Sequence, residues 1–147
     1  MTGSLRFLGL ARKAGQLEIG EETVGKAVRA KKAKVILSAG DVSDNSRNRA
    51  GKYAEICQAP WVRLPFTKEE IGMAVGRGSS GIIAVTDIGF AVGLVQKLAD
   101  EYPGQYEQEL TQLKEKEERA FARKREMKSH RNNVRMGKRR TKNEHND

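Results

Sequence analysis

The chain has 147 residues, of which 37% are hydrophobic and 32% are charged, and its formal net charge is +9. This length allows one domain with an appendage, and no apolar run is long enough to cross a bilayer. A single cysteine excludes an internal disulfide framework and fits a reducing, cytoplasmic compartment, while the excess of positive charge favours a polyanionic partner, most simply nucleic acid.

Apolar residues in the first hundred positions alternate between helical and strand spacing. Helical spacing of leucine and alanine ends at Gly15, whereas AKVILSA (33–39) and IIAVT (82–86) are continuous apolar runs of strand length. Runs that are apolar throughout indicate strands covered on both faces. The predicted elements, in chain order, are helix 5–15, strand 16–19, helix 21–32, strand 33–39, helix 46–58, strand 61–65, helix 67–76, strand 82–86 and helix 90–102.

The predicted helix starts carry capping signals of their own. Thr67 followed by Glu70 is a capping box, and Asp44 or Asn45 is expected to cap the helix over 46–58. Short apolar strands between helices predict an α/β fold, a three-layer α/β/α sandwich with a small central mixed sheet. We expect this domain to occupy residues 1–102.

The remaining residues, 103–147, form a charged tail. Residues 100–118 hold seven acidic and two basic side chains, whereas residues 119–142 hold eleven basic side chains and one acidic one. The tail has one short apolar stripe, formed by Tyr106, Leu110 and Leu113. We therefore expect a solvated helix to about residue 128 and a disordered basic end. This end either keeps the chain in solution or, as we favour, contacts RNA phosphates.

The sequence does not indicate catalysis. The predicted folded part contains no histidine, the most common general base, and Cys57 lies on the buried stripe of a helix. His130 and His145 lie far apart in the tail and cannot build a metal site with one cysteine. The loop GRGSSG (76–81) lacks the Lys-Ser/Thr ending of a P-loop and precedes a strand. We expect no enzyme, no metal and no cofactor.

A candidate binding surface lies where predicted strands join helices. Three such segments are expected to meet at one edge of the sandwich: residues 20–26, 40–45 and 76–81. Gly20 lets the chain turn, the first helical turn after it offers free N–H groups, and Lys26 lies about one turn further on the exposed face. Glu22 and Thr23 can accept hydrogen bonds from base amino groups.

Two acids stand at this helix start in a basic chain. Glu21 and Glu22 would repel a phosphate, so a nucleic acid would have to present base edges there. The simpler interpretation is that both acids complement the positive end of the helix dipole. In the loop, Arg77 can pair with phosphate, although a plain connection explains the loop equally. The candidate RNA-binding residues are Gly20, Glu21, Glu22, Thr23, Lys26, Arg29, Asp41, Gly76, Arg77, Gly78, Ser79 and Ser80.

The order of these motifs resembles the L-seven-Ae/L-thirty-e superfamily of ribosomal proteins, and within it the small bacterial YlxQ-type proteins. The resemblance covers about residues 4–100 and rests on a G-x-x-x-x-x-K helix followed by AKVILSAGDVSDNSRNR, EEIGMAVGRG and IIAVTDIGFA. It implies the three-layer sandwich and binding of kink-turn RNA, a sharply bent internal loop closed by tandem G·A pairs.

The resemblance also assigns positions in the second helix. The family pattern is Gly-x-Asn-Glu-x-x-Lys, in which Gly20 and Lys26 match, while Glu22 and Thr23 stand at the Asn and Glu positions. An ionised glutamate only accepts hydrogen bonds, whereas asparagine also donates them, so the pattern of base recognition is altered. The loop over 76–80 would lie near the protruding nucleotide.

Together these features predict a non-catalytic, monomeric RNA-binding protein associated with ribosomes or other structured RNA. The alternative is a ribosome-assembly or translation-linked module that docks onto a protein while its basic tail contacts RNA nonspecifically. A small enzyme acting on nucleotides is a further alternative, which a converging set of titratable groups in a pocket would favour.

Overall fold

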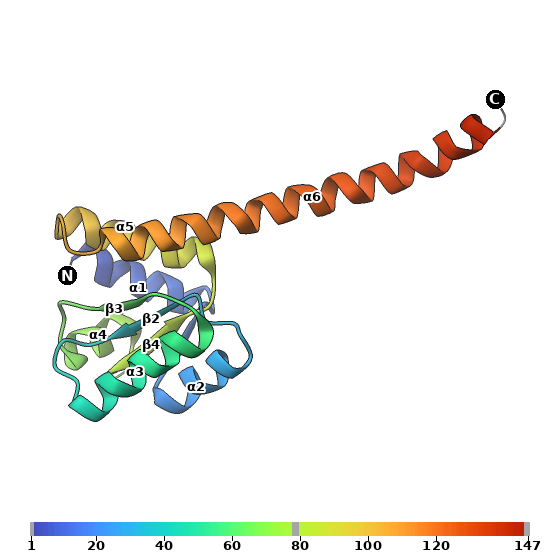
Figure 1. The fold of residues 1–147 in the computed structure, drawn as a ribbon. Helices are drawn as coiled ribbons and strands as arrows, with labels where there is room; N and C mark the ends of the chain where they lie inside the picture. The colour runs from blue at the N-terminus through green and yellow to red at the C-terminus, as the bar shows by residue number, and fades with distance from the viewer. Residues whose placement is uncertain (1, 78–79, 146–147) are drawn as a thin grey trace. The chain divides into compact units, whose positions relative to one another are not determined.

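The computed structural model describes residues 2–77 and 80–145, with side chains as far as Arg131. The chain divides into two compact units, residues 1–114 and 115–147. The elements are α1 (Gly3–Lys13), β1 (Leu17–Ile19), α2 (Glu21–Arg29), β2 (Val35–Ser38), α3 (Asp44–Cys57), β3 (Trp61–Arg63), α4 (Lys68–Val75), β4 (Ile82–Val85), α5 (Ile88–Glu101) and α6 (Glu107–His145) (Figure 1).

The four strands form one mixed sheet in the order β1–β4–β2–β3. β4 pairs antiparallel with both β1 and β2, and β2 pairs parallel with β3. The register sets Leu37 of β2 opposite Ile83 of β4 on one side and opposite Val62 of β3 on the other. The predicted α/β class and small mixed sheet are confirmed.

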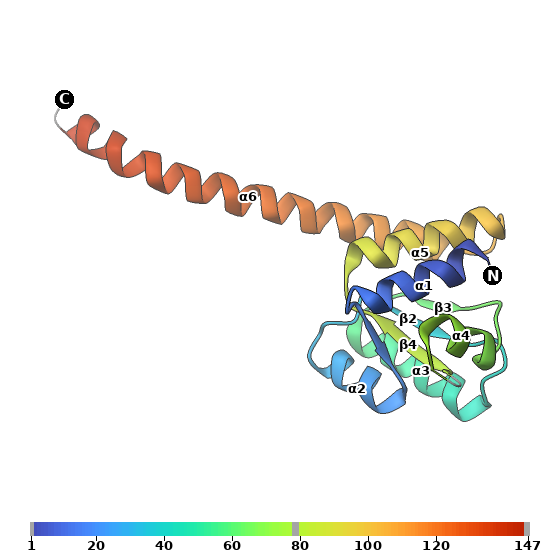
Figure 2. The same ribbon diagram turned by 180° about the vertical axis from the view of Figure 1, so that it is seen from behind.

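Helices cover both faces of this sheet (Figures 1 and 2). On β2, Ile36 packs into a cluster with residues of α2 and α3, whereas Leu37 packs into a larger cluster with residues of α1, α4 and α5. Successive strand side chains point to opposite faces, so a strand between two helical layers has no solvent-facing position. Every residue of β2 and of β4 is buried, as their continuous apolar sequences predict.

The helix caps differ from the prediction at one start and agree at another. Ser43 caps α3, because its hydroxyl accepts a 3.2 Å hydrogen bond from the backbone N–H of Ser46; the predicted caps Asp44 and Asn45 lie inside the helix. Ser43 takes the N-cap position because its backbone is extended, with φ −64° and ψ 161°, which is the conformation that an N-cap needs. At α4 the capping box of Thr67 and Glu70 is confirmed, with both reciprocal hydrogen bonds formed.

The first turns of α6 belong to the compact unit that ends at Lys114, rather than to a tail that starts at residue 103. Tyr106, Leu110 and Leu113 are all buried in the larger core cluster. The hydroxyl of Tyr106 donates a 2.9 Å hydrogen bond to the backbone carbonyl of Arg63 in β3. Burial, together with the nearby Tyr102 and Glu109, raises the pKa of Tyr106. The apolar stripe seen in the sequence is therefore part of the core.

The second unit, residues 115–147, is described by one element, the continuation of α6 to His145. This unit contains the charged tail that the sequence predicts. Glutamate, lysine and arginine make up 17 of the 33 residues from 115 to 147, and all three are good helix formers.

Candidate functional site

The start of α2 is an open helix end. Gly20 is its N-cap, with φ 99° and ψ 150°, a conformation that favours glycine. The backbone N–H of Gly20 donates to the carbonyl of Ile82 in β4 at 3.0 Å, which attaches this end to the sheet. Because glycine has no side chain, no cap hydrogen bond covers the first turn, and its N–H groups stay available to an acceptor.

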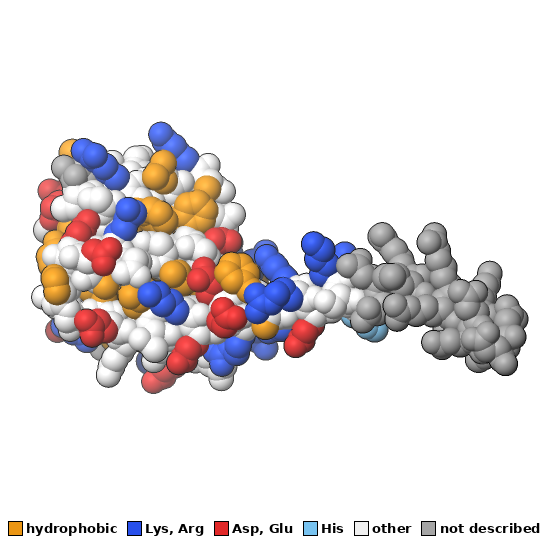
Figure 3. All heavy atoms as spheres, turned by 90° about the horizontal axis from the view of Figure 1, so that it is seen from above, with side chains coloured by type: hydrophobic (Ala, Val, Ile, Leu, Met, Phe, Trp, Pro, Cys, Tyr) orange, Lys and Arg blue, Asp and Glu red, His pale blue; other side chains and the backbone are white. Residues whose placement is uncertain are grey.

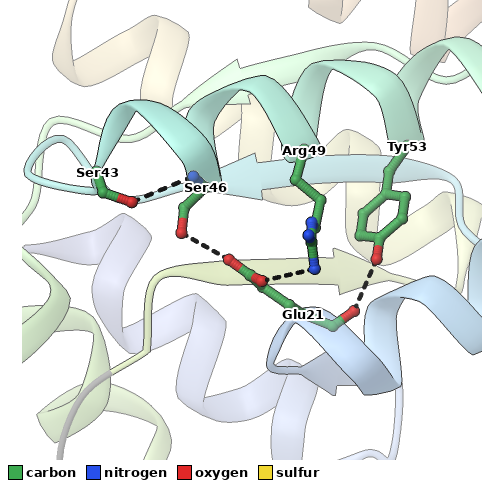
Figure 4. Close-up of polar contacts among 5 residues, drawn as sticks. All are labelled: Glu21, Ser43, Ser46, Arg49 and Tyr53. Carbon is green, nitrogen blue, oxygen red and sulfur yellow. Dashed lines mark hydrogen bonds and ion pairs between the residues drawn. The ribbon is translucent and has the colours of Figure 1, made fainter.

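Glu21 joins this helix start to α3 (Figure 4). Its Oε1 accepts a 2.6 Å hydrogen bond from the hydroxyl of Ser46, and its Oε2 lies 3.2 Å from Nη1 of Arg49. The hydroxyl of Tyr53 donates to the backbone carbonyl of Glu21 at 3.3 Å. One residue of α2 is thus held by three residues of α3, and its carboxylate charge is paired with an arginine.

The adjacent acid is arranged differently. Glu22, Thr23, Lys26 and Arg29 are all exposed on the side of α2 that faces away from the buried Val24, Ala27 and Val28. Within the residues that the structure describes, the carboxylate of Glu22 makes no hydrogen bond or ion pair. The two acids at the helix start therefore have separate roles: Glu21 fixes the helix and Glu22 stays open to solvent.

A cavity of about 290 Å³ opens beside Gly20 and Glu21. Its lining combines the end of β1 and the start of α2 with the segment before α3, the start of α4 and the segment that enters β4. The lining residues are Ile19, Gly20, Glu21, Val42, Ser43, Ser46, Lys68, Arg77, Ser80, Gly81 and Ile82. Two cations, Lys68 and Arg77, and several hydroxyl groups thus surround a space beside open helix amides, which is a chemistry suited to a phosphate-bearing ligand.

The loop after α4 is fixed at its base by a residue of α1. Gly76 ends α4 in the left-handed conformation with φ 75°, and the N–H of Arg77 donates to the carbonyl of Gly72 at 2.7 Å. The guanidinium of Arg12 donates to the carbonyl of Val75, one residue before this turn. Arg12 therefore holds the last turn of α4, where the loop begins.

The far end of the same loop is anchored by its backbone. Ser80 is buried, and its N–H donates to the carbonyl of Lys68 at 3.1 Å. Its hydroxyl is the only buried side-chain polar atom without a hydrogen-bond partner in the described part of the chain. The predicted site residues Gly78 and Ser79 lie outside the described residues.

The structure brings together only part of the predicted set. Gly20, Glu21, Arg77 and Ser80 line the cavity, whereas the other predicted residues of α2 lie on its exposed face. Asp41 does not line the cavity; its carboxylate accepts a 2.8 Å hydrogen bond from the N–H of Lys68 and so helps to fix the start of α4.

Sequence reasoning missed five residues of this region. They are Arg12, Ser43, Ser46, Arg49 and Lys68. Ser43 and Ser46 stand three residues apart at a helix start, a spacing that could have drawn attention to them as a cap and its neighbour. No local signal marks Arg12 or Lys68, because their roles depend on contacts between distant segments.

Two classes of site are not found in the described residues. Across positions 2–77 and 80–145, no group of three or more His, Cys, Asp and Glu side chains could hold a metal ion. Over the same ranges no helix has the length and apolar character that a membrane crossing requires.

The domain is a three-layer α/β/α sandwich with an open helix start beside a cavity that is lined by two cations and several hydroxyl groups. Residues 5–95 match the family described as "Ribosomal protein L7Ae/L30e/S12e/Gadd45 family", and the chain belongs to that family. The resemblance drawn from the sequence motifs is thereby confirmed.

Individual relatives are similar over the same region. The chain is 35% identical over 96 residues to the RNA-binding protein YlxQ of Bacillus subtilis (strain 168), covering 63% of this chain and 91% of that protein. It is 31% identical over 88 residues to the RNA-binding protein YlxQ of Enterococcus faecium, covering 60% and 84% respectively. A solved structure described as a protein with unknown function from Bacillus halodurans C is 28% identical with a TM-score of 0.62, covering 67% of this chain and 98% of that one.

Proposed function

We propose that this chain is a non-catalytic RNA-binding protein whose ligand is a kink-turn or a related structured RNA. The observation that carries the proposal is the cavity beside the uncapped start of α2, with Lys68 and Arg77 in its lining. Two relatives that carry the name RNA-binding protein, and membership of a ribosomal protein family, support it.

Two neighbouring surfaces would share the recognition. The exposed side of α2 offers Glu22 and Thr23 as acceptors for base amino groups, with Lys26 one turn further for a phosphate. The cavity, at about 290 Å³, is at the small end of ligand sites and suits a single protruding nucleotide. Arg77 and Lys68 would pair with the phosphate of that nucleotide. A rotation of the Ser80 side chain would let its unpartnered hydroxyl hydrogen-bond to the nucleotide as well.

The pairing of Glu21 removes an objection to phosphate binding at this helix start. A free carboxylate at the first helical position would repel the phosphate that the open N–H groups attract. Glu21 instead has its charge paired with Arg49 and is held by Ser46, so Glu22 is the one acid of this turn that faces the ligand. As an acceptor, Glu22 favours RNA that presents amino groups, as sheared G·A pairs do.

Ribosomal RNA is the first candidate partner, since the family is one of ribosomal proteins. Such a partner would give the protein a role linked to translation and a place in the cytoplasm. We propose that it binds as a monomer, because the recognition surfaces named above all lie within the residues of one copy, 1–114.

The test is a comparison of three RNAs with the full-length protein. They are a kink-turn, the same RNA with its tandem G·A pairs replaced by Watson–Crick pairs, and a straight duplex. We expect the kink-turn to bind at least about tenfold more tightly than either control, since the difference rests on base contacts. Equal binding to all three RNAs would contradict the proposal and favour a protein-docking module with nonspecific RNA contact.

A single substitution localises the contact to α2. Lys26→Ala is expected to weaken kink-turn binding by about 1–3 kcal/mol and to leave the straight duplex little affected. Lys52→Ala, which removes the same charge from an exposed position on α3, is the matched control and should change binding less than about twofold. An unchanged affinity of Lys26→Ala would show that RNA does not contact this face.

A further inference from the structure

The part of α6 beyond the compact domain carries a high density of positive charge that the cavity site does not use. From residue 119 to 142 there are eleven basic residues and one acidic residue, Glu126. Six of these cations have described side chains, and all six are exposed: Arg119, Arg123, Lys124, Arg125, Lys128 and Arg131. Figure 3 shows Lys and Arg side chains, in blue, along the described part of this helix.

Three of these cations share one side of the helix. Lys124, Lys128 and Arg131 are spaced by four and then three residues, which sets them one above the other along α6. The sequence continues the spacing with Arg135, Lys138 and Lys142. One cation per helical turn, at intervals of about 5.4 Å, is a regular row of charge along the helix axis.

Among the residues with described side chains, no acidic group neutralises the first three cations of this row. Arg125 pairs with Glu118 at 3.1 Å, on another side of the helix. In the described part of α6, the cations of Lys124, Lys128 and Arg131 form no ion pair. Like charges spaced one turn apart repel one another, so an external polyanion that screens them would bind with release of its own counterions.

The remaining surface of this segment distinguishes between two kinds of polyanion. A helix that lies on an anionic membrane needs a continuous apolar side opposite its cations. Among the residues of this segment with described side chains, the large exposed apolar ones are Phe121 and Met127, which are six positions apart and therefore fall on different sides of the helix. A nucleic-acid backbone needs no apolar side, because its phosphates are met by charge alone.

We propose that the basic segment of α6 is a second RNA-binding element, which contacts phosphates through the row that begins with Lys124, Lys128 and Arg131. It adds affinity without reading sequence, and it acts on any RNA, whether or not the cavity site recognises a kink-turn. The proposal therefore stands independently of the function proposed for α2.

The test uses the full-length protein and a straight RNA duplex, which lacks any kink-turn. The variant Lys124→Gln/Lys128→Gln/Arg131→Gln removes three cations from the row while keeping residues with good helix propensity. The variant Arg119→Gln/Arg123→Gln/Arg125→Gln removes three cations from other sides of the same helix and is the matched control. Circular dichroism of both variants checks that α6 keeps its helix content.

We expect the row variant to reduce the magnitude of the negative slope of log affinity against log salt by about 2–3, at 0.7–0.9 per lost phosphate contact. The control should reduce this magnitude by about one or less. A slope unchanged in the row variant, or lowered equally in both variants, would overturn the proposal. So would tighter binding of the unmodified protein to phosphatidylserine vesicles than to the duplex at the same salt concentration, because that result would assign the segment to a membrane surface.

Discussion

The hydroxyl of Ser46 donates a 2.6 Å hydrogen bond to Oε1 of Glu21, a residue 25 positions earlier in the chain. This bond ties the first turn of α2 to the first turn of α3 beside the cavity (Figure 4). It also explains why the two neighbouring acids at this helix start are not equivalent. Glu21 holds α2 against α3, whereas Glu22 is exposed to solvent.

Removing the carboxylate of Glu21 should destabilise the domain. Glu21→Ala deletes the acceptor of Ser46 and Arg49, and we expect the free energy of unfolding to fall by about 0.5–1.5 kcal/mol. The effect is moderate because the side chain of Glu21 is 38% exposed. Urea denaturation measures it, with Glu22→Ala as the control, which removes the same charge and should stay within about 0.5 kcal/mol of the parent protein. Equal losses in the two variants would contradict the scaffold role of Glu21.

Ser80 and Ser38 are both buried serines with opposite hydrogen-bonding states. The hydroxyl of Ser38 accepts a 3.0 Å hydrogen bond from the indole N–H of Trp61, whereas that of Ser80 has no partner among the described residues. Ser80→Ala should therefore leave the stability unchanged or raise it by up to about 1 kcal/mol, and Ser38→Ala should lower it by about 1–2 kcal/mol. Thermal unfolding of the two variants side by side makes the comparison, and a large loss in Ser80→Ala would reveal a partner for that hydroxyl.

Gly76 and Gly15 have the same left-handed backbone, with φ 75° and 73°, but different surroundings. A Cβ at position 76 would lie 2.7 Å from Nη1 of Arg12, and a Cβ at position 15 would meet nothing within 4 Å. Gly15→Ala should destabilise by about 1 kcal/mol from its backbone alone, and Gly76→Ala by more, because it displaces Arg12 from the carbonyl of Val75.

The arginine itself provides the control for that prediction. In an Arg12→Ala background, Gly76→Ala should lose its additional effect and match Gly15→Ala, which a double-mutant cycle measured by urea denaturation can test. A difference that persists without Arg12 would have to come from the backbone turn and would contradict the proposed contact.

The stability of the domain should depend on the ionisation of Tyr106 at high pH. Burial raises the pKa of this hydroxyl above 10.0. The hydroxyl donates a hydrogen bond to the backbone carbonyl of Arg63 only while it is neutral. The folded state therefore holds the proton more tightly than the unfolded state, so the stabilisation is complete below pH 10 and is lost as the pH rises through the pKa of the folded state.

Tyr106→Phe isolates this contribution. The variant should be less stable near neutral pH by about 1 kcal/mol, since the hydrogen bond is absent, and the gap from the parent protein should narrow as the pH increases beyond 10. Chemical denaturation at a series of alkaline pH values measures the gap. A gap independent of pH would mean that Tyr106 does not titrate differently in the two states.

Much of the fold follows from local patterns in the sequence. The apolar runs at 33–39 and 82–86 predict strands covered on both faces, and both strands are buried throughout. The capping box at Thr67 predicts the start of α4, because a cap depends on residues three positions apart. At the start of α3 the prediction of Asp44 or Asn45 as the cap was wrong, because Ser43 is also a good cap residue and the backbone conformation, which decides among the three, selects it.

The amino-acid sequence by itself determined the elements, the family resemblance and the residues of α2 that face solvent, because helical and strand periodicity act over only a few positions. Only the tertiary structure decided that Glu21 is held by α3, that Arg12 holds a carbonyl 63 positions away, and that Tyr106 closes the core against β3. These contacts require several elements to pack at once, and the geometry of that packing is set by the sheet order and not by any local run of residues.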